Sequence, residues 1–493
     1  MERKPKMGKA IILRNKIFYI FILCLAVFIA ADDQTVLVTL LPSMVLDLGI
    51  SVGELNKISW TITSYLLGFT LVMPLAGKLC DKFGYRLVLI FSMLLFSLGS
   101  LLVGITVNLP ESRYIPSKLN WLILFRFLQA MGGGAIIPIA IASVSLILEK
   151  KYWIYGFGLI GASAEAGGVI GPLWGSLILE IWDWPAAFFI NIPLAITIIV
   201  LALFMPKSQK NKNQIKLLDI LLISLIIIIS TIFISEYDGL GLNQIILLII
   251  ISSIVILTAV KIRLFNQEIL PNELIKSKTF LWSSVTHFFI GSSLIIVMVI
   301  IPLSGSTVFE LDSLTIGFSL LKLTAFIGLG SILGIFFTRL SLTFTLILGS
   351  ILISSGTLIY SNNIETPTNQ IDFIFYILGL GFGLFIVPIH NTGLYKISEN
   401  IRGISSSMIS LSRMLGMIFG LSLMTTIGTA RFSDLVSGMN LLSLDPDLQQ
   451  KINNDINTAG IEVFNEIMFG AFIFSIITFT TSIILIYYYH RNQ

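Results

Sequence analysis

Residues 17–48 read IFYIFILCLAVFIAADDQTVLVTLLPSMVLDL and carry two adjacent carboxylates, Asp32 and Asp33, in an otherwise apolar run. The run is longer than the roughly 20 residues that a helix needs to cross a bilayer. It is also too long for the apolar region of a signal peptide, which has about 7–15 residues. An ionisable side chain at membrane depth costs at least about 2.5–3.5 kcal/mol on insertion scales, so it generally marks a functional site with a partner. We therefore expect a membrane-spanning helix with a functional acid inside it.

The composition extends this expectation to the whole chain. Hydrophobic residues make up 55% of the 493 residues and charged residues only 12%, whereas soluble domains carry about 25% charged residues. The apolar runs are continuous and lack the alternation of a membrane β-barrel. The sequence therefore predicts an all-α integral membrane protein. We place fourteen transmembrane helices, at residues 17–48, 57–77, 86–107, 119–148, 154–181, 186–206, 217–235, 243–263, 279–303, 314–338, 343–361, 372–394, 402–427 and 466–489.

The spans are arranged as six, two and six. A basic, polar break after residue 206 ends an N-terminal six-helix bundle (1–206), and residues 207–278 form a linker with two extra transmembrane helices. A C-terminal six-helix bundle (279–493) follows. Two six-span halves predict a duplicated transporter whose site lies at the midplane between them.

Most of the Lys and Arg residues fall in the loops on the side of the N-terminus. By the positive-inside rule this predicts a multi-pass protein of the cell membrane with both termini in the cytoplasm. Because the basic residues lie in loops, the net charge of +4 does not indicate nucleic-acid binding. Two cysteines and three histidines in separate contexts predict neither a metal site nor a disulfide.

Residues 430–465 form the one sizeable stretch outside the predicted spans, on the outer side. Asp445 and Pro446, followed by apolar residues every fourth position, predict a short amphipathic helix in this outer loop. We expect it to lie on the membrane surface, with a substrate or partner role as the alternative.

Three glycine-containing segments stand out. Residues 77–86, between the second and third spans, read GKLCDKFGYR. Gly77 and Gly84 permit a tight reversal, Asp81 can face a helix N-terminus, and Arg86 adds positive charge to the loop. The alternative is a generic basic turn that fixes topology.

The fifth span carries glycines at positions 167, 171 and 175, with Pro172 among them. Gly167, Gly171 and Gly175 lie four residues apart on one helix face and allow another helix to pack closely. Pro172 removes a backbone hydrogen bond and favours a kink. The alternative is a simple packing motif without a role in transport.

The fourth span reads RFLQAMGGGA over residues 126–135. Arg126 inside a helix must find a carboxylate or carbonyl groups. At 1.5 Å per residue, Asp33 and Arg126 both fall in the outer half of a core about 30 Å thick. Asp33 is therefore the candidate partner of Arg126, and Gln129 is a candidate for the central cavity.

Three further charges, Glu165, Lys322 and Arg413, each lie roughly 13–17 Å from a membrane face by the same arithmetic. Charges at one level in three spans predict a polar central cavity. The alternative is that each charge pairs inside one half and holds helices together.

These segments resemble motifs of the major facilitator superfamily. Residues 77–86 are similar to its GxLaDrxGrkxxl loop, which implies a conformational latch, with Tyr85 in place of a basic residue. Residues 167–176 are similar to its gxxxGPxxGG antiporter motif, with Ser176 in place of the last glycine, and this motif goes with export. Residues 126–135 are similar to its RxxQGxGgA motif.

The resemblance narrows to the fourteen-span drug:proton antiporter family. Residues 33–42 resemble its LDxTIVNVALP pattern, residues 182–193 resemble its WRWxFxxNxP signature with Asp183 where Arg is usual, and residues 402–420 are similar to its penultimate span. The resemblance covers nearly the whole chain. Asp33 falls on the family's Asp-x-Thr pattern, whereas Asp32, rotated by about 100° on the helix, has no motif behind it.

We expect a proton-coupled secondary exporter of lipophilic, in some cases cationic, compounds such as drugs. The protein would work as a monomer in the lipid bilayer by alternating access, with no cofactor besides the proton gradient. Asp33 is the first candidate for the proton switch, Arg126 its modulator and Glu165 the second candidate, while the role of Asp32 stays open. No phosphate-binding loop of the GxxxxGK[ST] type is present in the sequence, so ATP is not the expected driver.

Three alternatives remain. The first is an importer or uniporter of a small solute on the same fold, independent of pH. The second is a receptor or assembly factor that has kept a transporter fold. An enzyme is the weakest alternative, because the sequence shows no nucleophile, metal cluster or paired catalytic constellation.

Overall fold

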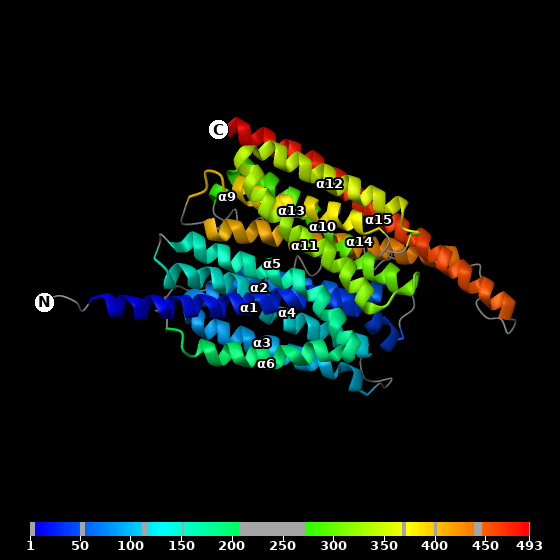
Figure 1. Ribbon diagram of the computed structural model, residues 1–493, viewed down its shortest axis with the longest axis horizontal. Coiled ribbons are helices and arrows are strands. Elements are labelled where there is room, and N and C mark those ends of the chain that lie inside the picture. Colours follow the sequence, from blue (N-terminus) through cyan, green and yellow to red (C-terminus); the bar gives the residue numbers. More distant parts are fainter. Residues whose placement is uncertain are drawn as a thin grey trace, which may run out of the picture.

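The computed structural model describes residues 5–49, 55–110, 117–149, 152–206, 272–366, 371–398, 402–437 and 446–492. Twelve long helices occupy this described part of the chain (Figure 1), joined by a 3-10 turn at Thr106–Asn108 and the short helix α9 (Asn272–Lys276). The long helices are α1 (Pro5–Asp47), α2 (Leu55–Phe83), α3 (Tyr85–Ile105), α4 (Lys118–Ile147), α5 (Trp153–Ile181), α6 (Pro185–Ala202), α10 (Lys278–Thr307), α11 (Ser313–Leu340), α12 (Leu342–Asn362), α13 (Asp372–Gly393), α14 (Arg402–Val436) and α15 (Pro446–Asn492).

Each long helix coincides with one predicted span, in the predicted order. Among the described residues, ten helices are long and apolar enough to cross a membrane, while α2 contributes the shorter apolar stretch Ile58–Met73. The two extra spans predicted at 217–235 and 243–263 lie outside the described residues. The described chain is thus an all-helical bundle of membrane-protein composition.

The helices pack as two groups of six. In Figure 1, α1–α6 lie in the lower part of the molecule and α10–α15 in the upper part. The same pairs recur in both groups: α1 packs on α5 as α10 packs on α14, α2 on α4 as α11 on α13, and α3 on α6 as α12 on α15. The groups meet mainly where α5 contacts α11 and where α2 contacts α14. This repeated pattern is that of a duplicated transporter, in which the site lies between the repeats.

Glycines within the spans let these helices approach closely. A methyl group at Gly132 or Gly134 of α4 would collide with the backbone of Phe96 or Phe69, respectively. In α13, Gly379 and Gly383 face the α11 backbone in the same way. These glycine runs are therefore packing surfaces inside helices, as their apolar surroundings in the sequence indicate.

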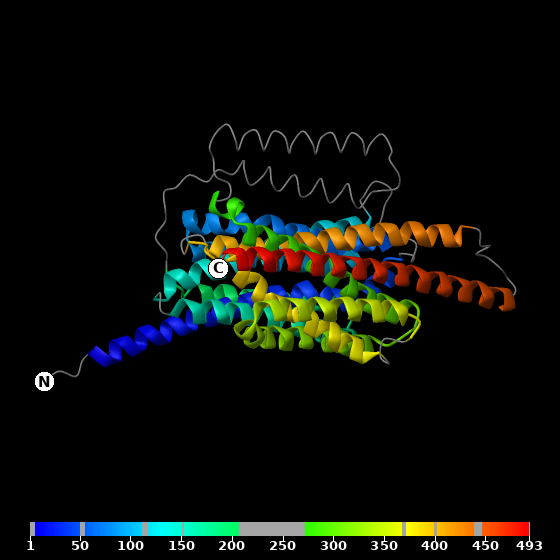
Figure 2. The ribbon, with the colours of Figure 1, turned by 90° about the horizontal axis from the view of Figure 1, so that it is seen from above.

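Both ends of the chain lie on the same side of the bundle (Figures 1 and 2), and we call this the terminal side. Helix α1 crosses the bundle once and ends on the opposite side, which we call the far side.

The prediction of an outer loop over 430–465 is wrong for most of that stretch. Helix α14 continues to Val436, and α15 begins at Pro446 and runs without interruption to Asn492. Both helices extend beyond the rest of the bundle on the far side (Figure 1). Pro446 is the first residue of α15, as predicted, but no proline follows to end the helix, and an internal glycine costs only about 1 kcal/mol.

A pair of salt bridges ties the extended ends of α14 and α15 together. Arg431 Nη2 lies 2.8 Å from Glu462 Oε1, and Arg431 Nε lies 3.0 Å from Glu466 Oε1. Glu462 and Glu466 are one helical turn apart, so one guanidinium bonds both. These contacts hold the two extensions together, and the packing of the start of α15 on a membrane surface stays a prediction.

The turn between α2 and α3 is shorter than predicted. Gly77 and Asp81 are part of α2, which continues to Phe83. The side chain of Asp81 lies outside the described part of the structure. Gly84 alone makes the reversal, with φ of 89°, a conformation that glycine adopts without strain. Arg86 Nη1 donates a hydrogen bond of 2.9 Å to the carbonyl of Met205, just beyond the end of α6, where a cation is favoured.

Candidate functional site

Asp33 is the centre of a buried polar network formed by four helices of the first half. Arg126 Nη1 of α4 lies 3.0 Å from Asp33 Oδ2. The other carboxylate oxygen, Oδ1, accepts hydrogen bonds from Gln129 Nε2 at 2.8 Å and from Asn191 Nδ2 of α6 at 2.6 Å. Gln129 also donates to Ser100 Oγ of α3 at 2.8 Å. The predicted contact between Asp33 and Arg126 is therefore present, and three donors converge on one carboxylate.

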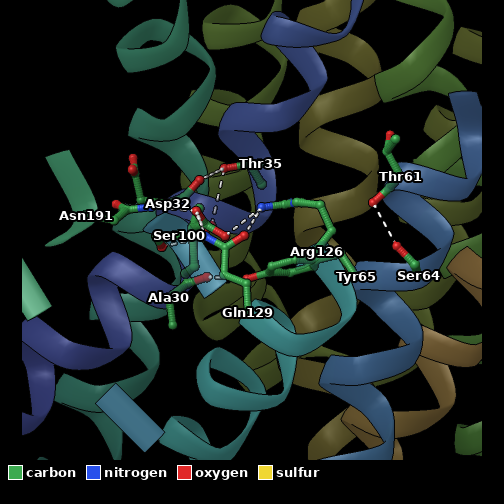
Figure 3. A network of polar contacts seen from close by, with 12 residues as sticks. Ala30, Asp32, Thr35, Thr61, Ser64, Tyr65, Ser100, Arg126, Gln129 and Asn191 are labelled. Carbon is green, nitrogen blue, oxygen red and sulfur yellow. Dashed lines mark hydrogen bonds and ion pairs between the residues drawn. The ribbon is translucent and has the colours of Figure 1, made fainter. Parts of the chain in front are cut away.

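Arg126 sits among aromatic rings and keeps unused donors. Its Nη1 also donates to Gln129 Oε1 at 2.6 Å, and its guanidinium carbon lies 4.1 Å from the centroid of the Tyr65 ring and 5.3 Å from that of Phe188. The Nε and Nη2 atoms are buried without a hydrogen-bond partner among the described residues. Figure 3 shows Arg126, Gln129 and Tyr65 gathered beside α1. Arg126 can therefore bind a further acceptor without giving up Asp33.

The burial of this ion pair sets its energetics. The side chains of Asp33 and Arg126 are both 0% exposed. Attraction between charges is strong in such a medium, but each charge has lost its hydration. Removing either partner would leave an uncompensated buried charge. A charged ligand beside the pair would also change the net charge of this buried site, so the pair limits which charged ligands can bind.

A small cavity adjoins Arg126 at the interface of the two halves. Its volume is about 20 Å³, which is enough for a water molecule. Polar atoms come from Gln34, Thr35, Tyr65 and Arg126, and the rest of the wall is apolar. The apolar lining consists of Leu37, Val38, Ile62 and Leu66 from the first half and Ile295, Met298 and Met417 from the second.

The contacts that join the halves lie from the middle of the spans toward the far side. Ser59 Oγ of α2 lies 3.3 Å from Thr425 Oγ1 of α14. Ser176, close to the far end of α5, contacts α11 at Gly317, where a methyl group would collide with the serine side chain. The described contacts thus hold the bundle together on the far side of the cavity.

The glycines of the candidate antiporter motif hold α5 against α1. A methyl group at Gly171 would collide with Thr35, and one at Gly175 would collide with Thr39. Gly167 faces the backbone of Phe28 and Asp32. The close packing predicted for these glycines is therefore present, and Pro172 lies between them inside α5.

The two other carboxylates predicted for the site lie close to this interface but outside the network. Asp32 is 8% exposed, and its Oδ1 is buried without a hydrogen-bond partner among the described residues. Glu165, on α5, is half-buried. No ion pair is described for either of them.

The structure does not bring Glu165, Lys322 and Arg413 into one cluster. Lys322 Nζ lies 2.5 Å from Asp372 Oδ2 in the first turn of α13, so it pairs inside the second half, as the alternative interpretation of this lysine predicted. Arg413 lies within electrostatic range of His287 and His390.

Arg413 and the two histidines form a second polar group, inside the second half. The His287 and His390 rings are 5.6 Å apart in an edge-to-face arrangement, and His287 Nδ1 lies 3.0 Å from the Ile409 carbonyl oxygen. The backbone of Arg413 packs against Gly291 of α10. This group explains why polar residues are buried there without belonging to the Asp33 network.

Four contributors to these clusters carry no role in the sequence interpretation: Tyr65, Ser100, Asn191 and Asp372. Asn191 had a usable signal, because an amide inside the apolar span 186–206 needs a hydrogen-bond partner. Ser100 and Tyr65 had none: a serine hydroxyl in a span commonly bonds within its own helix, and a single tyrosine does not reveal which helix its hydroxyl faces.

Comparison with known proteins agrees with this architecture. The family model described as Major Facilitator Superfamily matches residues 23–421. The chain belongs to this superfamily. Its relatives and its fold are those of transporters, so the protein is a membrane transporter and not an enzyme.

Two relatives of this major facilitator protein carry different names. A triacylglyceride transporter of Mycolicibacterium smegmatis is 24% identical over 433 residues, covering 83% of this chain and 75% of the relative. Multidrug resistance protein 3 of Bacillus subtilis is 26% identical over 438 residues, covering 86% of this chain and 82% of the relative.

Solved structures share the fold. A bacterial homologue of the human lysosomal transporter Spinster, in an inward-facing and occupied conformation, aligns with a TM-score of 0.67 at 14% identity and covers 95% of this chain and 96% of that one. A D-xylose–proton symporter aligns with a TM-score of 0.60 at 12% identity, covering 91% of this chain and 96% of that one.

Proposed function

We propose that this major facilitator transporter exports lipophilic compounds in exchange for protons. The observation that carries the proposal is the buried Asp33–Arg126 pair beside a mostly apolar cavity that both halves line. In this conformation the cavity has room only for a water molecule, so a ligand requires the halves to move apart. The apolar wall with a few fixed polar groups would then suit a lipophilic ligand, and the methionines Met298 and Met417 adapt to ligands of different shape. The cavity lies where alternating access would expose it to each side in turn.

The coupling follows from charge balance. A proton and a substrate compete when both change the charge of one buried group, because the site tolerates only a small net charge. A pH difference of one unit supplies about 1.4 kcal/mol per proton. Each net charge moved across the membrane adds about 2.3 kcal/mol per 100 mV. We assign the coupling centre to Asp33 and Arg126, with Glu165 as a second acid at the interface of the halves.

Further parts of the proposal rest on the sequence. The charge distribution supports a cell-membrane location with the terminal side in the cytoplasm. The apolar runs at 217–235 and 243–263 support fourteen spans and the fourteen-span drug:proton antiporter family. The glycine–proline motif, packed on α1, supports export, and residues 77–86 support a conformational latch. We propose a monomer as the functional unit.

The names of the relatives support a lipophilic substrate and leave two chemistries to compare. One relative is named for triacylglycerides and the other for multidrug resistance. A neutral lipid and a lipophilic cation both suit the apolar wall, but only the cation adds charge beside Asp33.

The proposal is tested with the purified protein in liposomes. Ethidium, a lipophilic cation, and a fluorescent triacylglycerol serve as probes, and an imposed pH gradient is the driving force. We expect gradient-dependent accumulation of at least one probe, its loss on adding a protonophore, and its loss in D33N.

Two results would change the assignment. Uptake that is equally fast with and without the gradient would favour the pH-independent importer or uniporter. Wild-type coupling in D33N would remove Asp33 from the coupling centre.

A further inference from the structure

Asp32 is buried almost as deeply as Asp33 but has none of its partners. Only 8% of Asp32 is exposed, and its Oδ1 has no hydrogen-bond partner among the described residues. Asp33, the next residue, receives one ion pair and two amide hydrogen bonds. Two adjacent carboxylates of one helix therefore meet opposite electrostatic conditions.

The packing of α1 against α5 keeps Asp32 in this position. A methyl group on Gly171 of α5 would collide with the backbone carbonyl of Asp32, and one on Gly167 would collide with the carbonyl of Phe28, one turn earlier on α1. The first half cannot rotate Asp32 toward solvent without separating these two helices. Figure 3 shows Asp32 at the α1 backbone beside Thr35, with Asn191 close by.

The charged and titratable groups around Asp32 offer it no cation. On α1 the neighbour is the Asp33 carboxylate, on α5 it is Glu165, on α2 it is Tyr65, and α6 carries no ionisable residue within Pro185–Ala202. The cation on α4, Arg126, bonds Asp33 and Gln129 through Nη1, and its Nε and Nη2 make no hydrogen bond to Asp32. On α10 and α11, His287 and Lys322 are engaged with Ile409 and Asp372. The other basic residues of these helices, Lys278 and Arg339, lie at the helix ends on the terminal side.

In these surroundings the ionised form of the Asp32 carboxyl group is less stable than its neutral, protonated form. Burial without a donor or a cation penalises the charged form, and the adjacent negative charge of Asp33 adds repulsion. Asp33 meets the reverse situation, because its three donors complement an anion. One proton shared by these two acids is therefore most stable on Asp32.

We infer that Asp32 holds the exchanged proton in this conformation, while Asp33 stays ionised in its pair with Arg126. The inference rests on the proposed proton-coupled export and specifies which acid carries the proton. The transfer breaks the O–H bond of Asp32, passes the proton to water on the terminal side, and leaves two adjacent carboxylates with one guanidinium. That uncompensated negative charge is removed either by a cationic substrate or by a new proton from the far side, so the two compete.

The protonation state is measured directly by infrared spectroscopy of the purified protein near neutral pH. We expect a carbonyl band of a protonated carboxylic acid that is present in the wild type and absent in D32N. The matched control is D47N, on the same helix, because Asp47 accepts a hydrogen bond of 2.8 Å from Trp184 Nε1. A band that persists in D32N would overturn the inference.

Transport in liposomes tests the role of that proton. With ethidium as the probe, a gradient of one pH unit allows about tenfold accumulation per exchanged proton. We expect D32N to lose this accumulation while ethidium-for-ethidium exchange falls much less, and we expect D32E, which restores a carboxylic acid, to recover it. If D32N failed to fold, exchange and accumulation would fall together. The role of Asp32 would then be judged from transport by D32E and from the infrared band.

The results separate this inference from the proposed function. Wild-type protein and D32N that accumulate ethidium equally would overturn the assignment of Asp32 and leave proton-coupled export intact. A wild-type protein whose uptake ignores the pH gradient would overturn proton-coupled export, and the role of Asp32 with it.

Discussion

Arg126 is the single residue whose truncation we expect to destabilise the fold most. R126A leaves the fully buried Asp33 carboxylate without its counter-charge, and breaking a buried pair costs about 3–5 kcal/mol. Thermal unfolding, followed by the reactivity of the buried Cys80 thiol, measures this loss. Removing both charges, with D33N and R126M together, should recover most of it. The control is R431A, because Arg431 pairs on the exposed surface.

Asn191 should matter through a single hydrogen bond. N191A removes the 2.6 Å donor to Asp33 Oδ1, and a hydrogen bond to a charged group contributes about 1.5–3 kcal/mol. The matched control is T197A on the same helix, since Thr197 bonds only the carbonyl of Pro193 in its own helix on an exposed face. Equal melting temperatures for the two variants would contradict the role of Asn191.

The sequence allows the charged pair of this site and its neighbour Gln129 to be predicted, but not the hydroxyl groups of Ser100 and Tyr65. Asp33 and Arg126 stand out because charge inside a span demands a partner, and their depths matched. Ser100 and Tyr65 could not be assigned, because a neutral polar group does not reveal which helix it faces. Lys322 was ambiguous for a related reason: its depth alone did not distinguish the cavity from Asp372.

At the scale of a helix, Gly171 should control the contact between α1 and α5. G171A introduces a methyl group that collides with Thr35 and the backbone of Asp32, and overpacking of this kind costs about 1–3 kcal/mol. We expect a lower melting temperature and slower transport. G161A is the control on the same helix, because nothing lies within 4 Å of the methyl group it adds. Parallel losses in both variants would show that the effect is not specific to this contact.

The start of α11 should respond to pH through Asp312, which lies outside the span. The pKa of this carboxyl is held below its usual value because it accepts hydrogen bonds from the Thr315 hydroxyl, at 2.6 Å, and the Thr315 backbone N–H, at 3.0 Å. The contribution of Asp312 is therefore present at neutral pH and is lost as pH falls through the lowered pKa. D312A should lose about 1 kcal/mol at neutral pH, as is typical of a lost N-cap. The difference between the melting temperatures of wild type and D312A should narrow on acidification, and a constant difference would contradict this role.

The hydrophobic runs of the sequence predict where each long helix lies, but they do not predict how long each helix is. The apolar runs placed the twelve long helices that are described, but an apolar run ends where the membrane environment ends, not where the hydrogen-bonded helix ends. Helices α14 and α15 continue past that point. Their polar extensions are held by Arg431, Glu462 and Glu466, a contact between two helices that periodicity within one helix cannot show.

For the whole molecule, the repeated packing of α1–α6 and α10–α15 implies that the halves move as units about their interface. The six helices of each half form a unit, because they pack mainly on one another and make fewer contacts with the helices of the other half. Motion of this kind changes contacts between the halves and preserves contacts within them. The interface is therefore the place to arrest transport without altering the ion pair.

A disulfide across the far side of the interface should stop transport reversibly. Ser59 Oγ and Thr425 Oγ1 are 3.3 Å apart and belong to α2 and α14, one from each half. In a background without Cys24 and Cys80, S59C with T425C should form a disulfide on oxidation and hold the far side closed. Transport of ethidium in liposomes should then cease and return on reduction, while ethidium binding from the terminal side persists.

The control is a bridge inside one half. Ser283 of α10 and Thr392 of α13 have hydroxyl oxygens 3.1 Å apart, so S283C with T392C joins two helices that move together. Oxidation of this pair should leave transport largely intact, because rocking of the halves does not change its length. If the cross-linked Ser59–Thr425 variant transports as fast as its reduced form, the far side does not open during transport. If the control pair stops transport as well, the second half does not move as a rigid unit, and its helices must rearrange against one another.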